Sequence, residues 1–183
     1  MVDRAEDQRM TVEEFLDYEG EPDTRYELVE GVIHAMAPAQ TTHGEIVMNC
    51  GFEIQSCLRK RPPCRAQSEA GIAIEESTFF QPDIAVTCAP PGVSQTIEAP
   101  TLIVEVLSPS TREHDLGRKL DAYKALETVQ EIWIVDSERR WLQAWVREDQ
   151  SWVGRDLIGS ADFESPVLEG LINLDEVYRN TTL

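Results

Sequence analysis

The sequence predicts an α/β fold with a mixed β-sheet flanked by helices and additional β-hairpins. Three observations carry this prediction. Apolar or alternating runs typical of strands recur along the chain, and two long stretches between them have loose helical spacing. These elements follow the order strand, helix, two strands, strand, helix, strand, which is typical of the α/β class.

The N-terminal part predicts a short helix and a hairpin. Residues 1–10 are polar and are expected to be a disordered lead-in to a single domain over residues 11–183. A capping box at Thr11 opens a helix that ends near Gly20. Two strands joined at a Glu-Gly turn are indicated by the stretch RYELVEGVIHAMA.

A long helix and a group of strands follow. A second capping box at Thr42 predicts a helix to about Lys60, which ends at the adjacent prolines. Paired strands are then indicated by CRAQSEAGIAIE and FFQPDIAVTC, and a proline-rich loop follows them. The predicted elements of the C-terminal half are the strand LIVEVL, a helix over 113–126, the strands EIWIVD, WLQAWVRE and SWVGRDLI, and a short helix capped by Asn173.

Composition limits the partners and the compartment. Sixteen Lys and Arg against thirty-four Asp and Glu give a net charge of -18, which disfavours nonspecific attraction to nucleic acid or anionic membrane. The polar N-terminus lacks a signal-peptide core, and no apolar run reaches bilayer length, so a cytoplasmic protein without membrane contact is expected. Buried thiols in a reducing compartment are the expected state of Cys50, Cys57, Cys64 and Cys88.

Two acidic residues at predicted strands point to metal chemistry. Asp83 follows a proline at the start of one apolar strand, and Glu105 lies inside the next. A carboxylate in an apolar strand is costly to bury unless a cation or hydrogen bonds compensate it. Mg²⁺ or Mn²⁺ prefers carboxylate oxygens, water and phosphate as ligands. The pair therefore predicts a site for one of these ions.

The helix after Glu105 adds polar groups on one face. Asp115, Lys119 and Tyr123 are spaced at i, i+4 and i+8. Lys119 pointing towards the strand end would orient a water and offset charge on a phosphoryl group. Each residue also has an ordinary alternative: Asp83 as a turn residue, Glu105 in a structural ion pair, and Asp115 with Lys119 as a surface pair.

Taken in order, these motifs resemble one family over residues 11–178. The motifs are RYELVEG, QPDIAV, IVEVLSPST, the residues Asp115, Lys119 and Tyr123, and VQEIWIVD. They are similar to the Uma2 family, which is related to the PD-(D/E)XK nuclease superfamily. The resemblance implies a restriction endonuclease-like core, with its acidic residues at the centre of a mixed sheet.

The resemblance also implies roles for individual residues. Asp83 and Glu105 match the two acidic half-motifs and would bind the metal, while Glu27 in the early YEL motif is the expected third acid. The superfamily usually has a lysine two positions after the second acid, where this chain has Leu107, so Lys119 is expected to replace it. Tyr123, Ser108 and Asp115 would support these groups. Glu30, His43 and Glu45 are weaker candidates.

The expected function is a Mg²⁺- or Mn²⁺-dependent endodeoxyribonuclease that works as a homodimer, with Trp141 and Trp145 as candidate contact residues. A nuclease-like fold that has lost catalysis and acts as a binding or assembly module is the alternative, and hydrolysis of a smaller phosphodiester is a third. The position of the basic residues relative to Asp83 and Glu105 is expected to discriminate among these three functions. One compact cluster is Arg59, Lys60, Arg61 and Arg65, and a scattered set is Arg112, Arg118, Lys119 and Lys124.

Overall fold

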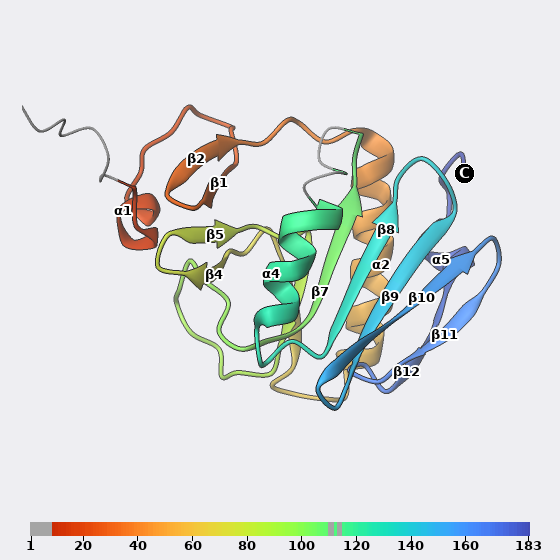
Figure 1. Ribbon diagram of the computed structural model, residues 1–183. Helices are drawn as coiled ribbons and strands as arrows, with labels where there is room; N and C mark the ends of the chain where they lie inside the picture. Colours follow the sequence, from red (N-terminus) through yellow and green to blue (C-terminus); the bar gives the residue numbers. More distant parts are fainter. Residues whose placement is uncertain (1–8, 110–111, 113–114) are drawn as a thin grey trace, which may run out of the picture.

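The computed structural model describes residues 9–109, 112 and 115–183, and it has the predicted α/β architecture with a mixed sheet. A six-stranded sheet forms the centre of the molecule (Figure 1). Only β7 and β8 run parallel in it. In spatial order, its strands are β10 (Ser151–Ile158), β9 (Trp141–Glu148), β8 (Glu131–Asp136), β7 (Pro100–Leu107), β6 (Ile84–Thr87) and β3 (Arg65–Ser68).

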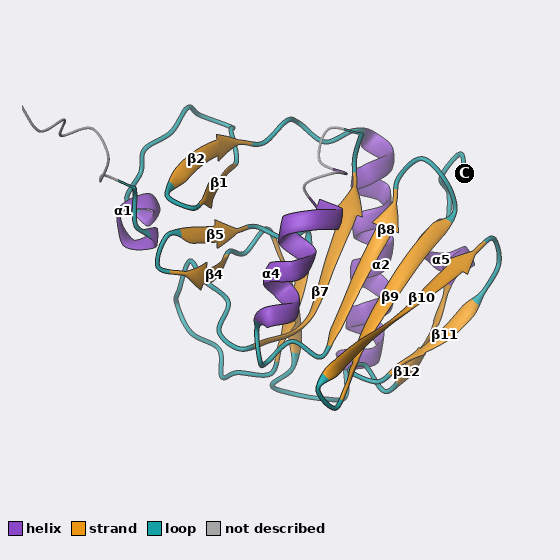
Figure 2. Cartoon of the chain, in the orientation of Figure 1, coloured by secondary structure: helices purple, strands orange, loops and turns teal. Residues whose placement is uncertain are grey.

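Helices cover both faces of this sheet (Figure 2). One face packs against α2 (Thr41–Leu58), and the other against a π-helical turn, η1 (Asp115–Lys119), that continues into α4 (Leu120–Ala125). Strand β7 is therefore buried on both sides, which explains its nearly unbroken apolar sequence. The predicted capping box at Thr42 is wrong, because the N-cap of α2 is Gln40, two positions earlier, and it makes no side-chain cap.

A second, four-stranded sheet lies beside the first. It contains β2 (Val32–Ala35), β1 (Tyr26–Val29), β5 (Thr78–Phe80) and β4 (Ile72–Glu75). The β1–β2 turn at Glu30 and Gly31 has positive φ angles of 50° and 78°, as the Glu-Gly signal suggests. Each of the two stretches predicted as paired strands is divided between the sheets: β3 pairs with β6, whereas β4 pairs with β5.

A short helix covers one face of the second sheet. This helix, α1 (Val12–Leu16), has the predicted capping box between Thr11 and Glu14, and its Phe15 packs on Phe79. Most of the predicted lead-in, residues 1–8, lies outside the described residues. The Met10 amide nitrogen, however, donates a hydrogen bond to the Gly31 carbonyl oxygen at 3.1 Å, so tertiary contacts begin before residue 11.

A C-terminal hairpin that the sequence did not predict is held by a buried carboxylate. It consists of β11 (Asp162–Ser165) and β12 (Gly170–Asn173) and leads into α5 (Leu174–Val177). The buried Glu131 carboxylate accepts hydrogen bonds from Trp133 Nε1 and Ser165 Oγ, both at 2.6 Å, and from the Val167 amide at 3.2 Å. Burial raises the pKa of Glu131, and these donors only partly oppose that shift.

One prediction about the cysteines is wrong. Cys64 and Cys88 form a disulfide, while Cys50 and Cys57 are free thiols. The pairing of Arg65 with Thr87 in β3 and β6 places the two bonded cysteines opposite each other, a register that residue spacing does not reveal. A disulfide is atypical of a reducing compartment, so the cysteines do not support the predicted cytoplasmic location. Within the described residues, no helix is long and apolar enough to span a membrane.

Candidate active site

Asp83 and Glu105 are brought together by strand register. Ile84 pairs with Val104 in the antiparallel β6–β7 ladder, and continuing this register sets Asp83 opposite Glu105. Asp83 Oδ2 accepts a hydrogen bond from the Val106 amide at 2.8 Å, which fixes the aspartate against β7. Both carboxylates are buried, and Glu105 is only 3% exposed.

Lys119 and Tyr123 compensate the buried Glu105. The Lys119 ammonium lies 3.3 Å from Glu105 Oε1, and the Tyr123 hydroxyl donates to the same oxygen at 2.7 Å. Lys119 is itself 1% exposed. The i, i+4 spacing of the two residues places both on the side of the helix that covers the sheet. A carboxylate is therefore accommodated inside an apolar strand by a cation and a hydrogen bond.

Glu27 joins this centre from the second sheet. Its Oε1 lies 2.8 Å from Lys119 Nζ and accepts a hydrogen bond from the Gln81 amide nitrogen at 2.9 Å. The Phe80 ring centroid lies 5.7 Å from Lys119 Nζ, and the ring meets Tyr123 edge-on. Lys119 thus links carboxylates from both sheets, next to an aromatic wall.

His43 reaches the same centre from the first turn of α2. Its Nε2 lies 3.4 Å from Asp83 Oδ2. Burial disfavours the charged imidazolium, but the hydrogen bond and the charge of Asp83 outweigh that effect and raise the pKa of His43 above its ordinary 6.5. The protonated imidazole and Asp83 therefore stabilise each other.

This pair predicts a pH-dependent contribution to stability. A raised folded-state pKa stabilises the fold fully below the unfolded value of 6.5, and the effect is lost as the pH rises through the folded pKa. His43→Ala is expected to lower the free energy of unfolding more at about pH 5.5 than at about pH 8.5, measured by urea titration. The exposed His34, changed to Ala, serves as control, and an equal loss at both pH values for His43→Ala would contradict the pairing.

The other predicted residues have different surroundings. Leu107 is buried in the core on the α4 side of the sheet. The position that often carries a lysine in the superfamily therefore packs in the core here. The Ser108 carbonyl oxygen accepts a hydrogen bond from the Arg112 amide at 3.0 Å. Asp115 begins η1, and its side chain lies outside the described residues. Of the weaker candidates, Glu30 pairs with Arg118 at 2.7 Å and Glu45 is exposed on α2.

The centre carries an excess of negative charge. Glu27, Asp83 and Glu105 are three carboxylates, whereas Lys119 is the permanent cation among them. Within the described residues, no three His, Cys, Asp or Glu side chains gather closely enough to enclose an ion alone. Asp83 and Glu105 supply carboxylate oxygens, which are the donor type that hard divalent ions prefer.

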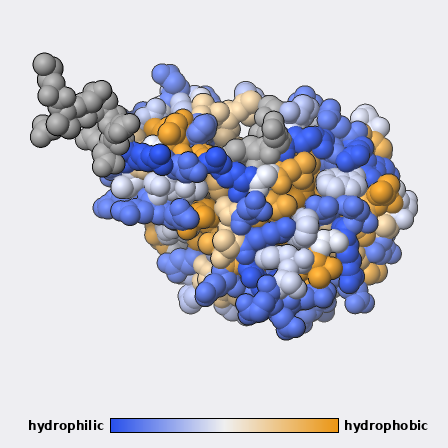
Figure 3. Space-filling model, in the orientation of Figure 1, coloured by the Kyte–Doolittle hydropathy of each residue, from blue (hydrophilic) through white to orange (hydrophobic). Residues whose placement is uncertain are grey.

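The two sets of basic residues lie at different distances from this centre. Arg59 follows the last turn of α2, whereas His43 lies in its first turn, a separation of about 24 Å along the helix axis at about 1.5 Å per residue. The compact cluster at Arg59 is thus remote from the carboxylates. The scattered set is closer, but Arg112 pairs with Asp136 at 2.8 Å and Arg118 pairs with Glu30. The face of the molecule in Figure 3 is mostly hydrophilic.

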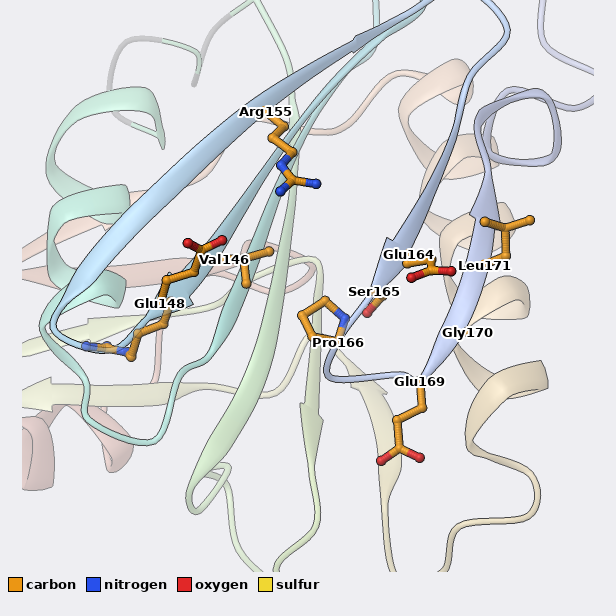
Figure 4. A pocket seen from close by; sticks show the side chains of 10 residues that line it. Val146, Glu148, Arg155, Glu164, Ser165, Pro166, Glu169, Gly170 and Leu171 are labelled. Atoms are coloured by element: carbon orange, nitrogen blue, oxygen red, sulfur yellow. The ribbon is translucent and has the colours of Figure 1, made fainter.

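A cavity elsewhere shows no catalytic arrangement. It has a volume of about 720 Å³ and lies between the β9–β10 and β11–β12 hairpins (Figure 4). Glu148, Arg155, Glu164 and Glu169 contribute charges of both signs to its wall. The Arg147 guanidinium at its rim donates to the Val129, Lys124 and Leu126 carbonyl oxygens, so it serves to hold the end of α4.

Comparison with known proteins identifies the family. A family model described as Uma2, "Putative restriction endonuclease", matches residues 12–174. The chain belongs to the Uma2 family. Two Synechocystis relatives described as uncharacterized also match this Uma2 chain: slr1290 is 30% identical over 70% of each chain, and sll1609 is 25% identical over 82% of this chain and 88% of the relative.

A solved structure supports the fold of this Uma2 protein. The crystal structure of a "putative nuclease belonging to DUF820" from Anabaena variabilis aligns with a TM-score of 0.75 and 22% identity. The alignment covers 92% of this chain and 97% of that chain. The predicted family and the restriction endonuclease-like fold are therefore confirmed.

Some groups at the centre were not identified from the sequence. The Gln81 amide that holds Glu27 is a main-chain donor, and no residue type signals such a role. Phe80 stood in an apolar run that predicted only a strand. His43 had a weak signal, its place in the first turn of a predicted helix, but its contact with Asp83 depends on how α2 packs against the sheet.

Proposed function

We propose that this Uma2 protein is a metal-dependent endonuclease that hydrolyses phosphodiester bonds in DNA. The buried Lys119 carries this proposal, because it lies between Glu27 and Glu105, and Asp83 stands opposite Glu105 just before strand β6. An acidic pair can bind a divalent ion that activates a water for phosphodiester hydrolysis, and an adjacent lysine can offset the charge that develops on the phosphoryl group. Membership of a family described as "Putative restriction endonuclease" supports the same function.

The proposed roles follow from the contacts. Asp83 and Glu105 would hold Mg²⁺ or Mn²⁺, which when bound lowers the pKa of a water and stabilises charge on phosphoryl oxygens. Lys119 would orient the attacking water and offset negative charge in the transition state. Tyr123 holds the Glu105 carboxylate through its 2.7 Å hydrogen bond. His43 and the Val106 amide hold Asp83 in the same way.

A plasmid-nicking assay tests this function. Wild-type protein is expected to nick supercoiled DNA with Mg²⁺ or Mn²⁺ and to stop when EDTA is added, while Asp83→Asn is expected to be inactive. Asp149→Asn, the same change at an exposed turn, is the control and should cut normally. Full metal-dependent nicking by Asp83→Asn would falsify the proposed role of Asp83.

A smaller phosphodiester is the second candidate substrate. The net charge of -18 and the position of Arg59 at the far end of α2 favour it, because a duplex needs several cations near the cleavage point. Bis(p-nitrophenyl) phosphate in the same assay separates the two. Cleavage of this ester without nicking of DNA would favour the small substrate. Cleavage of neither, with either metal, would overturn the hydrolase and favour a binding module.

A further inference from the structure

The outer face of α2 carries two large apolar side chains that are open to solvent. Met48 is 73% exposed and Phe52 is 66% exposed, one helical turn apart. Beside them runs a groove of about 340 Å³ between α2 and β3, lined by Val47, Gly51, Ala66 and Ile84 among others. Adjoining exposed apolar side chains and an apolar groove are typical of a protein interaction surface.

Strand β3 extends this surface to the edge of the sheet. It is the last strand of the six, with β6 as its only neighbour among the described strands. An edge strand presents main-chain groups that another chain can use. The Gln55 side chain donates to the Ala66 carbonyl oxygen at 3.3 Å, which joins the exposed side of α2 to this edge.

We infer that this surface, formed by the outer side of α2 and strand β3, joins two copies of the chain in a homodimer. A twofold interface uses the same patch on both copies and therefore needs projections and a matching hollow side by side. Phe52 and Met48 project next to the groove, as such a contact requires. Gly44 has open space where a side chain would stand, so no other described element of the chain covers this part of the helix.

Charge along α2 favours an antiparallel pair of helices. Glu45 is exposed near the start of the helix, whereas Arg59 and Lys60 are exposed just after its end. If two copies of α2 cross near Phe52 and run in opposite directions, Glu45 of each copy meets Arg59 of the other. The centre of the patch, at Met48 and Phe52, is uncharged. A second copy therefore matches this face in both apolar area and charge.

Trp141 and Trp145, the residues expected at the dimer contact, make contacts within their own chain. The Lys124 ammonium lies 3.2 Å from the Trp145 ring centroid, and Trp145 Nε1 donates to Gln143 Oε1 at 2.8 Å. Trp141 packs against the α4-side core. These contacts satisfy both rings locally, in contrast to Met48 and Phe52.

Sedimentation velocity of the full chain over a concentration series tests the interface. Wild type is expected to be a dimer at about 50 µM, and Phe52→Glu is expected to weaken association at least about 30-fold, as for a central interface residue. Ile158→Glu, at a β10 position that is 72% exposed, is the control and should dimerise as wild type does. A monomeric wild type, or a Phe52→Glu variant that still dimerises normally, would overturn the inference.

Charge reversal tests the antiparallel arrangement separately. Glu45→Arg and Arg59→Glu should each weaken the dimer, and the two changes in one chain should restore it, because the opposite charges meet again. Circular dichroism of each variant checks that the fold is retained. Failure of the double variant to recover would contradict the antiparallel pairing. None of these measurements depends on hydrolytic activity.

Discussion

Replacing Lys119 by methionine is expected to lower the free energy of unfolding by about 3–5 kcal/mol, the cost of breaking a buried ion pair from one side. Its ammonium lies 2.8 Å from Glu27 and 3.3 Å from Glu105, and all three side chains are buried. Without it, two adjacent carboxylates would remain in a site of low polarity. Urea unfolding followed by tryptophan fluorescence measures the change.

An exposed lysine provides the control for this experiment. Lys60→Met, just beyond α2, is expected to change stability by no more than about 0.5 kcal/mol. Glu27→Gln combined with Lys119→Met should recover part of the loss, since one uncompensated charge is then removed. A loss below about 1 kcal/mol for Lys119→Met would show that the ammonium does not hold the carboxylates together.

Substitution of Glu105 by glutamine is expected to reduce metal-dependent cleavage about 1000-fold. The change keeps the shape of the side chain but removes the charge that would bind the ion, and several kcal/mol of transition-state stabilisation correspond to about three powers of ten in rate. Tyr123→Phe removes only the hydroxyl that donates to Glu105 at 2.7 Å, and a supporting residue of this kind contributes about 10–100-fold. Initial rates with saturating Mn²⁺ measure both effects.

The relative size of the two losses of activity tests the roles of Glu105 and Tyr123. Glu105→Gln should be more damaging than Tyr123→Phe if Glu105 touches the ion and Tyr123 acts through it. Equal losses of activity, with both variants folded, would contradict a direct role for Glu105 with Tyr123 acting only through it. Wild-type protein treated with EDTA gives the baseline for complete loss.

Local sequence was sufficient for much of the fold. The nearly unbroken apolar run around Glu105 predicted a buried strand, and the structure places β7 between α2 and α4. The Glu-Gly turn and the capping box at Thr11 each depend on residues a few positions apart, so their signals lie within one short stretch. The same kind of signal failed at Thr42, since Thr42 lies inside α2 and the N-cap is Gln40.

The candidate site was only partly predictable, for a physical reason. Glu105 was noticeable because a carboxylate interrupts an apolar strand, and the spacing of Lys119 and Tyr123 placed both on one helix face. Contacts that depend on the docking of distant elements left no local signal. The Gln81 amide against Glu27 and the Cys64–Cys88 disulfide both arise from strand register, and the β11–β12 hairpin is anchored through the distant Glu131.

The most direct test of the central claim is a calorimetric titration with Mn²⁺, performed with and without a DNA duplex. It compares wild type with the Asp83→Asn/Glu105→Gln variant, and with Asp149→Asn as the matched control. We predict saturable binding by wild type and by the control, and its loss in the doubly substituted variant. Binding of Mn²⁺ by the double variant with wild-type affinity, or no binding by wild type even with DNA present, would contradict a metal centre at Asp83 and Glu105.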